Sequence, residues 1–166
     1  MSQLPDWLPA PLSYNDFGGD YEKFLAAVYE IFECDFKRSR PKYKGSALTY
    51  DARIEDGKEA VFWHVTTSTD IESKRRVPDL RRSERIAWLR AIIEHPDEKP
   101  LKLWTEKRRR GRRIHIWLEE FDYLVVLGER PRAMILITAV YTDSEHTRRS
   151  LNKRWVQSSG KANDAL

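Results

Sequence analysis

The sequence predicts an α+β fold, in which helices pack on an antiparallel four-stranded meander sheet with a β-hairpin before it in the chain. Three observations support this prediction. Apolar residues recur at helical spacing in separate stretches, the dipeptide Asp56-Gly57 marks a hairpin turn, and four strand-like stretches follow one another between residues 101 and 141. The chain has 166 residues, the size of one domain, and its 40% hydrophobic content suffices for a packed core.

The predicted organisation has three parts. Residues 1–19 form a proline-rich N-terminal arm, residues 20–157 a single α+β domain, and residues 158–166 a frayed C-terminal tail. Three prolines fall within seven residues of the arm, so we expect residues 4–11 to be extended rather than helical.

Three helices are expected. The first begins after Asp20, a good N-cap residue, and ends near Asp35, with its apolar residues on one face. The second covers residues 80–94 and follows a Pro-Asp start signal. The third is basic and begins after Asp143 or Ser144.

The expected hairpin has residues 50–54 and 58–66 as its strands, which places His64 at a strand end. The expected meander consists of residues 101–107, 113–118, 123–127 and 133–141. Its last stretch is apolar at both odd and even positions, as in a central strand that is covered on both faces.

Charge is distributed unevenly along the chain. The first 36 residues hold seven acids and one base, whereas residues 72–113 hold 15 lysines and arginines against 7 acids. Such a basic stretch attracts phosphate, which makes nucleic acid the leading partner. The alternative is a solvated basic surface with no ligand.

The sequence contains no signature of a metal site or a nucleotide cofactor. Cys34 is the only cysteine, no histidine cluster has metal-ligand spacing, and no glycine-rich phosphate-binding loop is present. We therefore expect no metal and no cofactor. The apolar runs are too short to span a bilayer, so we expect a cytoplasmic protein without a membrane partner.

An arginine-rich turn is expected at the tip of the first meander hairpin. Arg108, Arg109, Arg110, Arg112 and Arg113 would project from it towards RNA phosphates. If the loop has two or four residues, Trp104 and Trp117 share one sheet face with Lys102 and His115, where they would stack on RNA bases. The alternative is that a helix covers both tryptophans. Arg148 and Arg149, on the last helix, are further candidate RNA contacts.

Cleavage of RNA through its own 2′-hydroxyl needs only a base, an acid and cations from the protein. His64 is the candidate base because histidine titrates near working pH, and Arg82 and Arg85 on the following helix would stabilise the phosphate. The alternative for His64 is a hydrogen-bonded structural role.

Thr138 interrupts the apolar run of the last strand, so its hydroxyl must either bond a buried group or face a site. Tyr141 follows three residues later. Strand alternation places the two side chains on opposite faces unless the strand bulges or ends between them.

Four short segments together resemble the ribonuclease superfamily that groups barnase, EndoU, colicins E5 and D, and RelE, in particular its phage and mobile-element branch. These segments are Phe-Trp-His-Val-Thr at residues 62–66, residues 78–88 around Arg85, residues 122–127, and the Thr-Ala-Val-Tyr end of residues 136–141. The resemblance implies helices packed on an antiparallel four-stranded sheet and metal-independent cleavage that leaves a 2′,3′-cyclic phosphate. It also implies that His64, Arg85, Thr138 and Tyr141 are the catalytic positions.

The leading functional prediction is therefore a metal-independent endoribonuclease that acts as a toxin or defence effector. Its expected partners are RNA and, for a toxin, a cognate inhibitor or antitoxin protein. One alternative is a noncatalytic RNA- or DNA-binding module that uses the same basic surface, and another is a protein-binding inhibitor or assembly factor.

Overall fold

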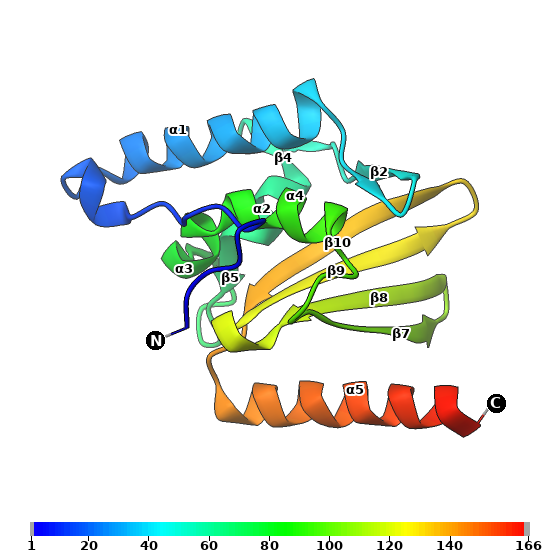
Figure 1. Ribbon diagram of the computed structural model, residues 1–166. Coiled ribbons are helices and arrows are strands. Elements are labelled where there is room, and N and C mark those ends of the chain that lie inside the picture. The colour runs from blue at the N-terminus through cyan, green and yellow to red at the C-terminus, as the bar shows by residue number, and fades with distance from the viewer. Residues whose placement is uncertain (1, 165–166) are drawn as a thin grey trace.

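The computed structural model describes the backbone of residues 2–164 and the side chains of residues 2–158. Its centre is one curled six-stranded sheet in the order β1-β2-β10-β9-β8-β7. The strands of this sheet are β1 (Lys42–Tyr43), β2 (Ser46–Tyr50), β7 (Lys102–Arg108), β8 (Gly111–Leu118), β9 (Tyr123–Arg130) and β10 (Ala133–Tyr141). Helices α1 to α4 cover one face of the sheet, and α5 lies along the other face (Figure 1).

The helices and the two small hairpins complete the fold. The α-helices are α1 (Tyr21–Phe32), α2 (Ala60–Thr66), α3 (Leu80–Glu84), α4 (Ile86–Glu94) and α5 (Glu145–Asp164). Three shorter or irregular helices are η1 (Tyr14–Phe17), η2 (Glu33–Arg38) and η3 (Glu119–Phe121). The hairpins are β3 (Ile54–Glu55) with β4 (Lys58–Glu59), and β5 (Thr67–Thr69) with β6 (Arg76–Pro78). None of the helices in residues 2–164 has the length and apolar character needed to cross a membrane.

The α+β class and the antiparallel meander β7-β8-β9-β10 are as predicted, but the prediction of a four-stranded sheet is wrong. Two more strands extend the sheet because β2 pairs in parallel with β10, with Leu48 opposite Met134, and β1 then pairs with β2. This pairing joins segments that are far apart in the chain. Hydrophobic periodicity carries no information about such a partner.

Both strands of the predicted hairpin are also wrong for most of their length, and in the first of them residues 51–53 belong to no strand. The turn at Asp56-Gly57 forms, with both residues at positive φ, but only Lys58 and Glu59 are extended after it. Residues 60–66 form helix α2, in which five of the seven side chains are buried. Because nearly all side chains of this short run are buried, its sequence shows neither the hydrophobic period of a helix nor that of a strand. Packing in the tertiary fold therefore decides between helix and strand. His64 therefore lies on a helix.

The other helices follow their predicted start signals. The Asp20 carboxylate accepts a hydrogen bond from the Lys23 amide and caps α1, and the chain stays helical beyond residue 35 through η2. Asp79 caps the predicted second helix in the same way, but this helix breaks into α3 and α4 at Arg85. The Ser83 hydroxyl bonds the main-chain carbonyls of Asp79 and Thr66, which competes with regular helical bonding just before the break.

The two ends of the chain differ in how they meet the fold. The N-terminal arm has no helix before η1, and its Leu8 side chain is buried against the core between the sheet and α1 to α4. Helix α5 runs to Asp164, beyond the predicted boundary at residue 157. The predicted tail thus begins as helix, and its last two residues, like Met1 of the arm, lie outside the described residues.

Alternation along the strands divides the interior into two cores. In β8, Ile114 and Ile116 face α1 to α4, whereas His115 and Trp117 face α5. The core under α5 is small, and its buried members are Trp104, Trp117, Leu124, Val126 and Leu151.

Candidate nucleic-acid interface

The arginine-rich turn forms where the sequence predicts it. Arg108 pairs with Gly111 across the β7–β8 hairpin, so Arg109 and Arg110 are its two-residue turn. Every residue from 107 to 113 is exposed. The hairpin therefore presents six basic side chains to solvent.

A second basic turn lies directly beside this one. The β9–β10 turn carries Arg130 and Arg132, and Arg130 Nη1 donates a hydrogen bond to the Arg110 carbonyl over 3.4 Å. The backbones are also close here, because a Cβ on Gly111 would lie 2.8 Å from the Glu129 carbonyl oxygen. Gly111 has a φ of +114°, a conformation that favours glycine.

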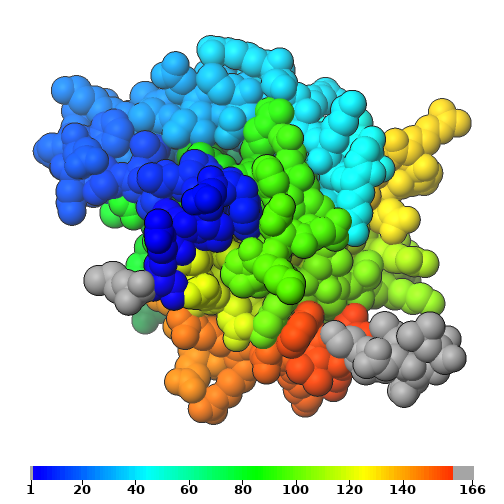
Figure 2. Space-filling view, in the orientation of Figure 1, coloured from blue at the N-terminus to red at the C-terminus, as the bar shows by residue number. Residues whose placement is uncertain are grey.

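The third basic turn joins β1 to β2. Because β2 runs parallel to β10, both strands begin at the same end of the sheet. Lys44 and Ser46 of this turn line one side of a hollow of about 450 Å³, and Arg130 and Arg132 line another side. Figure 1 shows all three turns at this end of the sheet, and Figure 2 shows the β9–β10 turn projecting from the surface.

We call residues 42–46, 107–113 and 129–132 the basic end. They contain ten lysines and arginines and one acid, Glu129. Two of the cations have a carboxylate partner: Arg108 with Glu106 at 3.0 Å, and Lys44 with Asp97 at 3.4 Å. The remaining cations have no ion-pair partner among the described carboxylates, so their charge is available to an anionic ligand.

The predicted aromatic stacking surface is not accessible. Trp104 pairs with His115 and Lys102 with Trp117 on one sheet face, as the two-residue loop requires. This face is covered by α5, which leaves Trp104 2% and Trp117 0% exposed. The assignment of both tryptophans to RNA binding is therefore wrong for this structure, because their rings form the core under α5.

A charged network that the sequence analysis missed lies at the edge of this core. Glu106 accepts two hydrogen bonds of 2.6 Å from Arg154 of α5, and Arg154 Nη2 lies 3.0 Å from Nε2 of His115. The Arg154 hydrogen bonds lower the pKa of Glu106 to about 2, and burial lowers the pKa of His115 to about 4. The network borders a cavity of about 580 Å³ between β7 and α5.

One signal in the sequence points to part of this network. Strand alternation places Glu106 on the same face as Trp104, and the two-residue loop then brings His115 to that face as well. The partner Arg154 has no comparable signal, because its position depends on how α5 docks.

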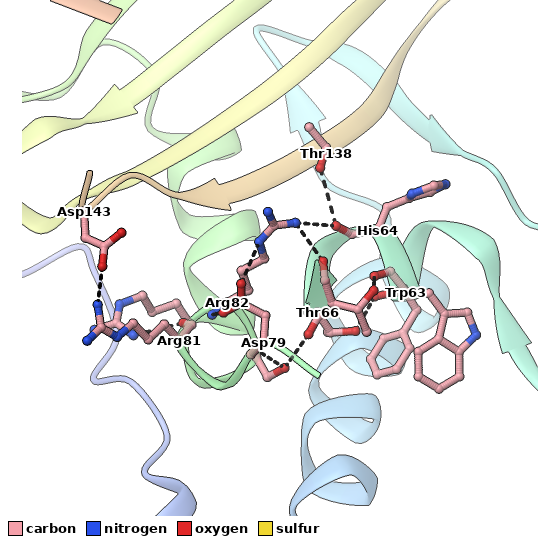
Figure 3. Close-up of polar contacts among 12 residues, drawn as sticks. Trp63, His64, Thr66, Asp79, Arg81, Arg82, Thr138 and Asp143 are labelled. Atoms are coloured by element: carbon pink, nitrogen blue, oxygen red, sulfur yellow. Dashed lines mark hydrogen bonds and ion pairs between the residues drawn. The ribbon is translucent and has the colours of Figure 1, made fainter. Parts of the chain in front are cut away.

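The predicted catalytic residues form two pairs rather than one site. His64 is exposed on α2, and its main-chain carbonyl accepts hydrogen bonds from Arg82 Nη1 at 3.3 Å and Thr138 Oγ1 at 3.4 Å. In Figure 3 the His64 imidazole points away from Arg82. The contact between these elements therefore uses the backbone of His64 and leaves its ring in solvent.

Arg82 is held by protein groups on several sides. Its Nη1 also donates to the Thr67 carbonyl at 2.8 Å, and its Nε lies 3.2 Å from the Asp79 carboxylate. Burial lowers the pKa of Arg82. The Arg82 guanidinium is half-buried and already hydrogen-bonded, and it links α3 to the end of α2. Its contacts therefore give no support to the assignment of Arg82 to RNA binding.

Arg85 and Tyr141 form the second pair. The Arg85 guanidinium lies 4.8 Å from the Tyr141 ring centroid and 5.2 Å from that of Trp88, a cation–π arrangement. Strand β10 does contain a bulge, but it falls between Leu136 and Thr138. The strand is regular from Thr138 to Tyr141, and the two side chains have different partners: the Thr138 hydroxyl contacts the His64 carbonyl, and the Tyr141 ring contacts Arg85.

Arg148 and Arg149 lie at the start of α5, at the other end of the sheet from the basic end (Figure 1). Arg148 pairs with Asp122, and Arg149 with Glu145 at 2.9 Å. Both arginines thus lie away from the basic end with their charges paired, and their assignment to RNA binding stays a prediction.

Two further observations concern ligands and relatives. Among the side chains that the structure describes, no three histidine, cysteine or acidic groups come close enough together to hold a metal ion. No protein-family model, curated protein or solved structure matches this chain.

Proposed function

We propose that the chain binds nucleic acid, with RNA as the leading ligand, by its phosphate backbone at the basic end. The observation that carries this proposal is the convergence of three turns that are separate in sequence, with ten bases and one acid between them. Lysine and arginine side chains release condensed counterions when they contact phosphates, and this supplies sequence-independent affinity.

The test replaces arginines that have no described ion-pair partner. We expect the triple variant Arg109→Ser, Arg110→Ser, Arg112→Ser to bind RNA more weakly at every sequence. The slope of log affinity against log salt should fall by about 0.7 for each single-strand phosphate that the variant no longer binds. Folding should be spared, because exposed surface substitutions cost within about 0.5 kcal/mol.

A control variant removes the same charge elsewhere. Arg53, Arg75 and Arg149 are exposed and lie outside the basic end. Their replacement by serine should change the affinity and the salt slope much less than the triple variant does. Equal losses in the two variants would mean that only net charge matters and would refute the assignment of the site.

A metal-independent endoribonuclease is the second candidate function. It is favoured by the meeting of His64, Arg82 and Thr138, which come from three elements distant in the chain and share one carbonyl oxygen (Figure 3). In this candidate the exposed His64 imidazole removes the 2′-hydroxyl proton, and the 2′-oxygen attacks the phosphorus of RNA held at the basic end. The bond from phosphorus to the 5′-oxygen breaks, the 5′-oxygen takes up a proton from solvent, and the new end is a 2′,3′-cyclic phosphate. A toxin or defence role, with a cognate inhibitor, depends on this activity.

Incubation of purified protein with RNA in excess EDTA separates the two candidates. Fragments with cyclic phosphate ends that vanish in His64→Ala and persist in His146→Ala, a variant of an exposed histidine on α5, would support cleavage. Salt-sensitive binding with intact RNA would support the noncatalytic module. Absence of binding at low salt would contradict both and favour a protein-binding role.

A further inference from the structure

We infer that the basic end grips a nucleic acid duplex by phosphates on both sides of a groove, rather than a single strand. This inference rests on the proposed function and specifies its ligand. Lys44, Arg110 and Arg132, one from each turn, are the phosphate contacts that it assigns, and Lys44 would exchange its exposed partner Asp97 for a phosphate.

The basic end has no exposed aromatic surface on which the bases of a single strand could stack. Proteins that bind single strands combine basic grooves with exposed aromatic side chains, on which successive bases stack. The three turns contain one aromatic residue, Tyr43, and it is only 7% exposed, with the Lys44 ammonium 5.7 Å from its ring centroid. The tryptophans of the neighbouring strands are covered by α5.

The three turns are evenly spaced along one end of the sheet. Each turn joins two paired strands, and in the order β1-β2-β10-β9-β8-β7 successive turns are centred two strands apart. With strands about 4.8 Å apart, the turn centres lie roughly 10 Å apart and span roughly 20 Å in all. The B-DNA major groove is about 12 Å wide, and an A-form RNA helix has a wide, shallow minor groove. The roughly 10 Å between neighbouring turns is close to the width of the major groove, so two neighbouring turns can reach the phosphate rows on its two sides.

The β7–β8 and β9–β10 turns are in direct contact with each other. The hydrogen bond from Arg130 to the Arg110 carbonyl and the close approach of Gly111 to Glu129 hold the β7–β8 and β9–β10 turns side by side. A fixed array of charges suits a stiff duplex, whose phosphates are already in place. A flexible strand would have to lose conformational entropy to fit the same array.

The side chains of the three turns suit contacts with phosphates and include none that reads adenine. The three turns contain no asparagine or glutamine, the residues that read adenine in a groove. Their charge comes from lysine and arginine on exposed turns. RNA and DNA duplexes present the same phosphate chemistry, so the experiment includes both.

The test measures binding by fluorescence anisotropy with three probes of about two helical turns: an unstructured single-stranded RNA, an RNA duplex and a DNA duplex. We expect the full chain to bind at least one duplex about tenfold or more tightly than the single strand, at roughly 0.1 M salt. The probe with the higher affinity identifies the source of the phosphates. A single strand bound as tightly as the better-bound duplex overturns the inference and leaves the proposed function standing, whereas absence of binding to all three probes overturns both.

Single substitutions test whether all three turns contact the duplex. Lys44→Ser, Arg110→Ser and Arg132→Ser should each weaken duplex binding about three- to tenfold and lower the salt slope by about 0.9. Arg149→Ser, near the start of α5 and remote from the basic end, is the control and should change neither the affinity nor the salt slope. If Arg110→Ser alone weakens binding, the ligand sits on one turn and the assignment of a groove is refuted. Thermal melting confirms that each variant is folded.

Discussion

The Glu106 carboxylate accepts two 2.6 Å hydrogen bonds from the Arg154 guanidinium, one from Nε and one from Nη2, and this pair fastens α5 to the edge strand β7. The apolar contacts of α5 with the sheet are few: Leu151 is buried in the core under α5, and Trp155 packs against it. The docking of α5, which keeps Trp104 and Trp117 covered, therefore relies on polar contacts such as this ion pair and the pair of Arg148 with Asp122.

We predict that Arg154→Met destabilises the protein by about 1 to 3 kcal/mol, because it leaves the half-buried Glu106 carboxylate without its main partner. Urea unfolding at neutral pH measures the loss. The control is Arg149→Met, which breaks the exposed pair with Glu145 on the same helix and should cost no more than about 0.5 kcal/mol. Equal losses in the two variants would contradict a special role for Arg154.

The buried imidazole of His115 makes stability depend on pH. Its pKa in the folded protein is lowered by burial from 6.5 to about 4, so between these values the unfolded chain binds a proton that the folded chain does not. Stability is therefore complete above pH 6.5 and falls as the pH is lowered towards 4. We expect a loss of about 2 to 3 kcal/mol between pH 7 and about 4.5.

Urea unfolding curves at a series of pH values measure this dependence. His115→Gln should flatten it, whereas His146→Gln, which alters an exposed histidine on α5, should leave it unchanged. Glu106 contributes in the same direction but at lower pH, since its pKa falls from 4.5 to about 2 in the folded protein. A pH dependence in His115→Gln equal to that of the parent would refute the assignment to His115.

Local sequence signals predict the parts of this fold that depend on neighbouring residues. Asp20 and Asp79 cap helices because an N-cap acts within one turn of chain. The arginine-rich turn and the shared face of Trp104 and Trp117 follow from a two-residue loop and strand alternation. These features need no information about distant segments.

The parts that the sequence did not reveal depend on contacts between distant segments. The parallel pairing of β2 with β10 brings the turn at Lys44 beside the turn at Arg132, and no local pattern encodes it. The structure of residues 60–66 depends on burial from several sides, which removes the period that distinguishes helix from strand. The sequence therefore predicted the β7–β8 turn of the basic end, but not that the other two turns lie beside it.

Trp104 provides a direct test of whether the covered face takes part in binding. We predict that Trp104→Phe lowers the thermal stability and leaves the affinity for RNA unchanged, because the ring is buried against His115 at a centroid distance of 5.0 Å. Anisotropy titration of the folded variant measures the affinity. A loss of affinity comparable to that of a variant at the basic end would show that α5 moves aside and exposes the tryptophans to bases.

Gly111 is the position where the shape of the basic end is most sensitive to a single atom. Gly111→Ala places a methyl group 2.8 Å from the Glu129 carbonyl oxygen and also strains a φ of +114°, so it should cost about 2 to 4 kcal/mol. Gly57→Ala is the matched control: its φ is +81° with nothing near the added methyl, and it should cost only about 1 kcal/mol. Because the clash separates the β7–β8 turn from β9, Gly111→Ala should also weaken duplex binding, measured by anisotropy on the folded protein, whereas Gly57→Ala should not. Equal stability losses and unchanged binding in both variants would show that the close approach at Gly111 does not shape the basic end.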